Sequence, residues 1–316
     1  MAFLMGDGHT GHTGRSVSNI RNALLIVNPA ARRATASMRV AMREFEKQDV
    51  RCDVVITERR GHAGEVAAAN AAGYDAVFAL GGDGTAVEVI SALVPDGPPV
   101  GVLPGGTGNL LARALSVPLG TSRAVRALIH GEEARCDLGR LNDGTRFAIG
   151  VGVGIDAAMI AGTSQAWKRR VGVLAYILAG AAQVLRRRRF KARVTVDGTT
   201  VTGDAAVVLV ANFGVLLSGL VTLGEGIRQD DGKLDVCIFD PRGIEDIIRI
   251  TRKLLFRDFS PDKAMTYMAG TVIRVETDIP LPAQADGELI GHTPFVATVE
   301  PLAARLLVPH CQINRQ

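Results

Sequence analysis

The stretch VFALGGDGTAVEVISAL, from Val77 to Leu93, changes its periodicity at the centre. A short apolar run leads into Gly-Gly-Asp-Gly-Thr, and apolar residues then recur at helical spacing. This order is typical of a buried strand, a glycine-rich turn and a helix. Because glycine lets the backbone come close to a ligand, the N–H groups at the start of such a helix can bind an anion, most naturally a phosphate. The stretch therefore predicts a phosphate-binding loop.

The pattern of a strand followed by a helix recurs around this stretch. Between about residues 22 and 126, the apolar runs LLIV, DVVI, AVFAL and PVGVL are each followed by a helical pattern. Such alternation predicts parallel βαβ units in a doubly wound α/β sheet. After about residue 140 most apolar runs are strand-like, interrupted by one helical segment near 164–188 and an amphipathic helix over 244–256. We expect this half to be mainly antiparallel β, with a hairpin turn at Asp197-Gly198.

Composition places the chain among globular proteins of a reducing compartment. Its 316 residues, 47% of them hydrophobic, are enough for two domains with substantial cores. Its cysteines are Cys52, Cys136, Cys237 and Cys311. Their wide spacing indicates neither a disulfide framework nor a zinc site, which favours the cytoplasm. The apolar segment 171–185 is too short to span a membrane, and 205–224 contains Asn212 and several glycines within a β-branched run that is typical of buried strands.

Polar or glycine-rich residues follow each of the four predicted parallel strands. The first strand ends at Asn28-Pro29 and the second at Thr57, while the third and fourth lead into GGDGT (81–85) and PGGTGN (104–109). In a parallel sheet these strand ends lie along one edge, where open α/β folds bind ligands. We therefore expect one site built from four loops, with both glycine-rich loops facing the same anion.

The two glycine-rich loops match neither the P-loop nor the dinucleotide fingerprint. Asp83 would repel a phosphate unless a cation lay between them, so we expect Mg²⁺ at the site. Structural roles are open for the same residues. Asp83 suits a turn, Thr85 and Glu88 have the spacing of a capping box, and Thr107 suits the N-cap of the next helix.

The second half of the chain adds acidic turns. QDDGKLDV (229–236) and QADGELI (284–290) each contain Asp-Gly, and GVGIDAA places Asp156 after an apolar run. Asp-Gly is an ordinary hairpin connector, so each turn taken alone is read as structural. Two such turns facing the phosphate edge would instead contribute to the site.

Taken in order, these motifs resemble the bacterial diacylglycerol kinase family, which is related to the sphingosine kinases. The motifs are GGDGT with Glu88, GGTGNLLAR, DLG (137–139), GVGIDA, KRRVG, DDGKLDV and DGE (286–288). They cover about residues 22–309, and the ordered set is more specific than GGDGT, which NAD kinases share. The resemblance implies an N-terminal doubly wound nucleotide-binding domain of the NAD kinase/diacylglycerol kinase type. It also implies a C-terminal β-sandwich domain, with ATP in the cleft between the two.

The expected domain boundaries follow from the resemblance and the change of rhythm. Residues 1–20 are expected to be a disordered extension, 21–140 the nucleotide-binding domain and 141–302 a β-rich domain for a lipid substrate. Whether 303–316 rejoins the first domain is left open.

The resemblance also implies roles for individual residues. ATP contacts are implied for Asn28, Pro29, Ala30, Ala31, Arg32, Thr57, Gly81, Gly82, Asp83, Gly84, Thr85, Ala86, Val87, Glu88 and Thr107. Glu288 is implied as the catalytic base, and Asp83 as a catalytic residue that organises the Mg²⁺ network. Asp231, with the backbone of Arg228 and Lys233, is implied to hold Mg²⁺, and Asp156 to meet the lipid headgroup. Arg32 and Val87 depart from the family pattern, which usually has glycine and asparagine there.

The implied activity is transfer of the γ-phosphate of ATP to a hydroxyl of a membrane lipid, with diacylglycerol as the first choice. We expect a cytoplasmic enzyme that associates peripherally with the inner face of the membrane, and no nucleic-acid partner. The net charge is +4, and basic residues cluster at 167–170 and 186–190, on either side of an apolar segment that either contacts anionic lipid or is buried. The alternatives are a soluble NAD kinase and a non-catalytic nucleotide- or lipid-binding regulator. A homodimer is left open.

Overall fold

The computed structural model describes residues 15–16, 20–31, 34–154, 189–213, 215–216, 221–222, 228–256, 258 and 260–310. Arg32, Asp156, the apolar segment 171–185 and most of the predicted N-terminal extension lie outside these ranges. None of the helices within the described ranges combines the length and the apolar character that crossing a bilayer requires.

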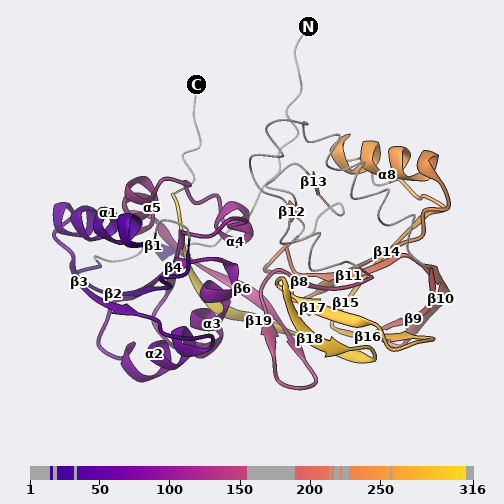
Figure 1. Cartoon of the computed structure of the whole chain (residues 1–316), viewed down its shortest axis with the longest axis horizontal. Coiled ribbons are helices and arrows are strands. Elements are labelled where there is room, and N and C mark those ends of the chain that lie inside the picture. Colours follow the sequence, from indigo (N-terminus) through magenta and orange to yellow (C-terminus); the bar gives the residue numbers. More distant parts are fainter. Residues whose placement is uncertain are drawn as a thin grey trace, which may run out of the picture.

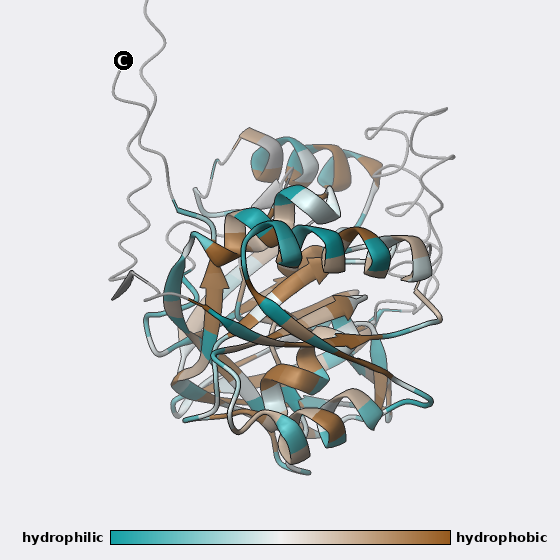
Figure 2. Cartoon of the chain, turned by 90° about the vertical axis from the view of Figure 1, so that its left-hand side faces the viewer, coloured by the Kyte–Doolittle hydropathy of each residue, from teal (hydrophilic) through white to brown (hydrophobic). Residues whose placement is uncertain are grey.

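The first half of the chain alternates strands and helices, as the sequence predicts. Its elements are β2 (Asn22–Val27), α1 (Ala34–Lys47), β3 (Arg51–Ile56), α2 (His62–Asn70), β4 (Ala76–Gly81), α3 (Asp83–Ala92), β5 (Val100–Pro104), α4 (Leu110–Ala114) and α5 (Thr121–Ile129). The four strands are parallel and lie in the order β3-β2-β4-β5. In Figures 1 and 2, α1 and α5 cover one face of this sheet, and α2 and α3 cover the other. The predicted doubly wound α/β arrangement is therefore confirmed.

Burial explains why this sheet is covered on both faces. Every residue of β4 and β5 is buried, as is all of β2 after its first residue. Such strands read as continuous apolar runs because side chains on both faces need cover. Figure 2 shows the apolar strands between helices whose polar residues face outward.

The second half is built from antiparallel strands. Its elements are β6 (Glu132–Leu141), β7 (Arg146–Phe147), β8 (Gly150–Val153), β9 (Phe190–Val196), β10 (Thr199–Ala205), β11 (Val207–Ala211), β12 (Val215–Leu216), β13 (Val221–Thr222), β14 (Leu234–Phe239), α8 (Ile244–Phe256), β15 (Met265–Gly270), β16 (Val272–Thr277), β17 (Pro282–Ala285), β18 (Glu288–His292) and β19 (Phe295–Val308). Six of the strands form the sheet β15-β14-β11-β8-β17-β18. Its apolar face packs against β9, β16 and β19 to form a second core. This is the β-sandwich that the resemblance implies.

Strand β19 joins the two halves. Its first part pairs with β16, and its last part lies parallel to β5 through Leu306 and Val100. Phe295 and Ala297 belong to the second core, whereas Leu306 and Leu307 belong to the first. The parallel sheet and one layer of the sandwich are consequently parts of the same 11-stranded sheet, in which the short strand β1 (Arg15–Ser16) pairs with β6.

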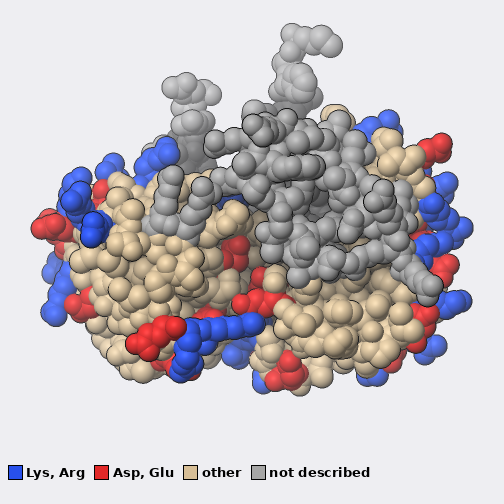
Figure 3. Space-filling view, viewed as in Figure 1, with Lys and Arg blue, Asp and Glu red and all other residues tan. Residues whose placement is uncertain are grey.

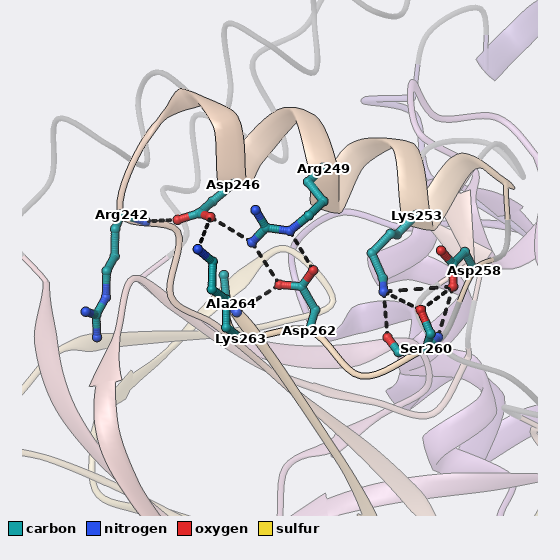
Figure 4. A network of polar contacts seen from close by, with 9 residues as sticks. All are labelled: Arg242, Asp246, Arg249, Lys253, Asp258, Ser260, Asp262, Lys263 and Ala264. Carbon is teal, nitrogen blue, oxygen red and sulfur yellow. Dashed lines mark hydrogen bonds and ion pairs between the residues drawn. The ribbon is translucent and has the colours of Figure 1, made fainter.

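Helix α8 is fastened to the loop that precedes β15 (Figure 4). The Arg249 guanidinium donates hydrogen bonds to both carboxylate oxygens of Asp262, at 2.7 and 3.0 Å, and one to Asp246 at 2.7 Å. One turn further on, the Lys253 ammonium donates to the Ser260 carbonyl at 2.6 Å. The bounds of α8 match the helix predicted from the sequence over 244–256.

Candidate active site

The candidate site begins where the order of the parallel strands reverses. The chain passes from β2 to β3 on one side and then returns to β4 on the other, so a crevice forms between the ends of β2 and β4. Asn28 lies at this point, and its backbone N–H donates to the Leu80 carbonyl at 3.0 Å. Its side-chain amide donates to the Thr85 hydroxyl at 3.0 Å and accepts the Ala30 N–H at 2.9 Å. Asn28 thus ties the end of β2 to the start of α3.

The two glycine-rich loops pack against each other. The Gly105 N–H donates to the Gly81 carbonyl at 2.9 Å, and a Cβ on Gly106 would lie 2.7 Å from the Gly82 Cα. A Cβ on Gly81 would come within 2.6 Å of the Thr85 hydroxyl. Close contact between the loops therefore accounts for several of the glycines. That both loops face one anion stays a prediction.

The carboxylates of the first loop cap neighbouring helices. Asp83 accepts the Leu111 N–H at 2.9 Å, at the start of α4. Glu88 accepts the N–H groups of Gly61 and Ala63, at 2.9 and 3.2 Å, at the start of α2. Helix α3 itself begins at Asp83, after Gly82. The capping box predicted for Thr85 and Glu88 is therefore wrong, because each side chain is held by a residue of another element.

Thr107 does not cap the next helix. Asn109 occupies the N-cap position of α4, and its side chain accepts the Gly106 N–H at 2.8 Å while donating to the Gly106 carbonyl at 2.9 Å. Thr107 is exposed and does not line the hollow described next. The predicted N-cap role of Thr107 is wrong.

A hollow of about 460 Å³, the first hollow, lies at this strand edge. It is lined by Asn28, Pro29, Ala30, Thr57, Glu58, Arg59, Arg60, Ala63, Gly82, Gly84, Thr85, Glu88 and Glu288. All of these except Glu288 come from the parallel-sheet half. Asp83, whose neighbours on both sides line the hollow, has its carboxylate on the start of α4 instead.

Glu288 reaches this edge from the β-sandwich. It is the first residue of β18, and a Cβ on Gly84 would lie 3.2 Å from one of its carboxylate oxygens. Its other oxygen accepts a short hydrogen bond from the Arg60 guanidinium. Glu288 and Arg60 also line a second hollow of about 390 Å³, together with residues of the sandwich half that include Asp286, Leu289 and Ile290. Figure 3 shows acidic and basic side chains side by side along this junction between the two halves.

Asp286 fixes the turn from which Glu288 projects. Its carboxylate accepts backbone N–H groups from Ala148, Ile149 and Gly150, at 2.7, 2.8 and 2.9 Å. Burial raises the pKa of Asp286 to about 6, although the three N–H groups oppose that rise, and the nearby negative charge of Asp83 contributes to it. The predicted Asp-Gly hairpin turn is confirmed, because β17 and β18 pair on either side of it. No local sequence pattern indicates the three hydrogen bonds that Asp286 accepts.

Two sequence families match the chain over these two halves. The diacylglycerol kinase catalytic domain matches residues 22–141, and the YegS C-terminal NAD kinase beta sandwich-like domain matches residues 150–308. The chain belongs to the bacterial diacylglycerol kinase family.

Relatives from several bacteria agree with this assignment. A diacylglycerol kinase of Staphylococcus aureus is 25% identical over 280 residues, which are 87% of this chain and 88% of the relative. An uncharacterized protein of Synechocystis sp. is 29% identical over 237 residues, which are 74% of this chain but only 54% of that longer protein. The crystal structure of a diacylglycerol kinase from Bacillus anthracis str. Sterne has the same fold, with a TM-score of 0.72 and 21% identity over 92% of this chain and 98% of that one.

The residues implied to hold Mg²⁺ in this family lie in one turn. The Asp231 carboxylate accepts the Lys233 N–H at 3.0 Å, and the Arg228 side chain pairs with Asp230 at 3.0 Å. The donors in question, the Asp231 carboxylate and the carbonyls of Arg228 and Lys233, are all oxygens, which fits the preference of Mg²⁺. In the described ranges no group of three or more His, Cys, Asp and Glu side chains converges as a metal site. The carbonyls would therefore have to supply much of the coordination.

Asp137, from the DLG motif, anchors this turn against β19. Its carboxylate is fully buried and accepts N–H groups from Gly232 and Leu302, both at 2.7 Å. Burial raises the pKa of Asp137, and the negative charges of Asp231 and Asp230 add to that effect. The DLG motif alone does not indicate this role for Asp137.

The structure brings together some of the predicted site residues and separates others. Asn28, Pro29, Ala30, Thr57, Gly82, Gly84, Thr85, Glu88 and Glu288 line the first hollow. Ala86 is buried in the first core, and Ala31 packs against that core. Val87 lines the second hollow, and Gly81 is buried beneath the Thr85 side chain. Arg60 was missed, and its signal was its place in the TERRGHA segment after the second strand.

Proposed function

We propose that the chain is an ATP-dependent lipid kinase that phosphorylates diacylglycerol to give phosphatidic acid. The observation that carries this proposal is the approach of Glu288, from the sandwich half, to Gly84 and Thr85 of the loop at the strand-order reversal. A carboxylate that lines the first hollow can accept a proton from an attacking hydroxyl. Membership of the diacylglycerol kinase family supports a kinase of this class.

In the proposed reaction, the triphosphate occupies the first hollow. The backbone from Gly82 to Thr85, at the start of α3, is oriented to meet phosphate oxygens with N–H groups. Glu288 takes the proton of the lipid hydroxyl while the hydroxyl oxygen forms a bond to the γ-phosphorus. The bond from that phosphorus to the β,γ-bridging oxygen breaks, and its electron pair leaves with ADP. Phosphoryl transfer depends chiefly on such positioning and on charge stabilisation.

Asp231, with the carbonyls of Arg228 and Lys233, would hold Mg²⁺, which supplies charge and order near the cleft when bound. The Asp83 carboxylate holds the start of α4 and lies near enough to Asp286 to raise its pKa. We therefore propose that Asp83 positions the glycine-rich loop and in this way helps to organise the proposed Mg²⁺ network. Peripheral contact with an anionic membrane surface, through 171–189, is also part of the proposal, and of this segment only Arg189 is among the described residues.

Transfer of labelled γ-phosphate from ATP to a panel of acceptors in mixed micelles with Mg²⁺ tests the proposal. The panel consists of diacylglycerol, monoacylglycerol, phosphatidylglycerol, a sphingoid base and NAD. We expect labelled phosphatidic acid. Label on NAD would favour the soluble NAD kinase, label on another lipid would change the acceptor, and ATP binding without any transfer would favour a non-catalytic regulator.

A further inference from the structure

Arg60 is the cation shared by the two hollows. It lines both, as does Glu288, the residue with which it pairs. Among the described cations lining them, Arg59 donates to both oxygens of Glu65, at 2.8 and 2.6 Å, on the surface of α2. Arg146 is held by Glu300, with one bond at 3.1 Å. Arg60 is thus the described cation of these hollows whose partner is itself a proposed catalytic group.

The backbone beside Arg60 is held in place, while its side chain is mostly exposed. Gly61 has a φ of +80°, and its N–H is held by the Glu88 carboxylate. The side chains of Arg60 and Glu288 are 69% and 44% exposed. Because exposed ion pairs contribute little net stability, exchanging one anionic partner for another loses little. A guanidinium is also well shaped to bind phosphate oxygens through two parallel N–H groups.

The Arg60–Glu288 pair also conflicts with the chemistry proposed for Glu288. Arg60 donates to one Glu288 oxygen, and a cation paired with a carboxylate favours its ionised form and so opposes its taking up a proton. At the same time, negative charge on the transferring phosphoryl group needs a cation nearby. A single movement of the Arg60 side chain meets both requirements.

We propose that Arg60 is a catalytic residue that exchanges Glu288 for the γ-phosphate when ATP binds. The exchange frees the Glu288 carboxylate to take the hydroxyl proton and places the guanidinium against the phosphoryl group. This inference rests on the proposed kinase function, and it adds a cause for the pairing of Arg60 with Glu288 across the two halves.

A cycle of ATP affinities tests the exchange without relying on turnover. Affinity for ATP with Mg²⁺ and no lipid is measured by calorimetry for the wild type, Arg60→Ala, Glu288→Gln and the double variant. If Arg60 leaves Glu288 for ATP, Glu288→Gln tightens ATP binding more when Arg60 is present than when it is absent, by up to about fivefold. If the pair stays closed, Arg60 shields the phosphates from Glu288, and the substitution tightens binding more in the Arg60→Ala background. That second result, or equal effects, overturns the proposal.

ADP is the matched ligand, because it lacks the γ-phosphate. We expect the coupling between Arg60 and Glu288 to be much smaller for ADP than for ATP. Equal coupling for the two nucleotides would contradict a contact with the γ-phosphate. Thermal unfolding of each variant checks that it folds, and the exposure of the pair predicts little change.

Turnover gives an independent readout. Arg60→Ala is expected to lower kcat by about 100-fold, and Arg60→Lys by less, because the charge stays but the two-pronged contact is lost. Millimolar guanidinium should restore part of the Arg60→Ala activity. The control is Arg274→Ala, which removes an exposed arginine paired with Glu276 at 3.0 Å on β16 and should leave kcat unchanged. An Arg60→Ala variant with normal kcat would refute the catalytic role.

The two proposals fail in different ways. If the wild type labels diacylglycerol but the affinity cycle has the sign of a closed pair, the exchange is wrong and the kinase stands. If no lipid is labelled but the cycle has the predicted sign for ATP, the exchange stands and the acceptor is wrong.

Discussion

At the scale of single residues, Asp286 determines where the proposed base lies. It occupies a left-handed backbone conformation, with a φ of +49°, two residues before Glu288. Its carboxylate gathers three N–H groups from 148–150, so the turn bearing Glu288 is held to the segment that leads into β8. A neutral amide in place of the Asp286 carboxylate would lose one of the two oxygens that accept these three N–H groups.

We predict that Asp286→Asn lowers the free energy of unfolding by about 2 kcal/mol, since the amide offers one acceptor oxygen and turns its NH₂ group toward N–H donors. Urea unfolding near neutral pH measures the change. The matched control is Asp278→Asn, in which an exposed carboxylate accepts a single N–H, from Lys191 at 3.1 Å. The control should change stability by less than about 0.5 kcal/mol. Equal effects of the two substitutions would mean that the three hydrogen bonds accepted by Asp286 stabilise the fold no more than the single bond accepted by Asp278.

Single residues also show where prediction from sequence ends. The Asp-Gly turns at 197–198 and 286–287 are visible locally, because residues with positive φ and the flanking strand patterns are adjacent in the chain. The partners of Thr85 and Glu88 lie 57 and 27 residues away, and no local pattern encodes them. The predicted capping box failed for that reason.

At the scale of elements, α8 depends on a partly buried ion pair for its position. Its bounds follow from an amphipathic pattern, but its attachment to Asp262 depends on a loop that the pattern does not describe. The hydrogen bonds from Arg249 are the main cause that lowers the pKa of Asp262 to about 2. The lowered pKa of this carboxyl group means that its ionised form stabilises the folded protein.

The sign of the pH dependence follows from this lowered pKa. Asp262 stabilises the fold fully above the ordinary aspartate pKa of about 4 and loses that contribution as the pH falls toward 2. We predict that Asp262→Asn costs about 2 kcal/mol at pH 6 and progressively less between pH 4 and 2.5. Urea unfolding of both proteins across this range measures the difference. A difference that stays constant with pH would refute the role of the Arg249–Asp262 pair.

The parallel strands show how far element-level reasoning extends. Continuous apolar runs located β2, β4 and β5, and the carboxyl-edge rule placed Asn28 beside the GGDGT loop. That both glycine-rich loops face one anion, as the same rule predicts, stays a prediction. Packing of Gly105 and Gly106 against the first loop is a contact between backbones, and sequence spacing does not distinguish it from a contact with phosphate.

At the scale of the whole molecule, β19 makes the two halves one sheet. Its residues enter both cores, and it pairs with β16 at one end and with β5 and β6 at the other. A destabilising substitution in the last part of β19 should therefore destabilise the sandwich as well. The sites contributed by the two halves are held together by the same strand.

We predict that Leu306→Ala, at a side chain 2% exposed, lowers the free energy of unfolding by about 2–5 kcal/mol. Hydrogen exchange should accelerate in both β4 and β16, because β19 contributes to both cores and the substitution weakens its packing. The control is Ala63→Gly, at a buried residue of α2, which covers the face of the parallel sheet opposite α1 and α5. This substitution should leave hydrogen exchange in β16 unaltered. Faster exchange confined to the first half after Leu306→Ala would show that the halves unfold separately.

The proposed function depends on Glu288 acting across the cleft as the base of a lipid kinase. The most direct measurement is the rate of labelled phosphatidic acid formation from ATP and diacylglycerol by the wild type, Glu288→Gln and Glu276→Gln, the last altering a half-buried glutamate of β16 that pairs with Arg274. We predict product from the wild type and from the Glu276→Gln control. In Glu288→Gln the rate should fall by at least about 100-fold, while ATP binding is retained. Near-normal turnover by Glu288→Gln would contradict the proposed role of Glu288.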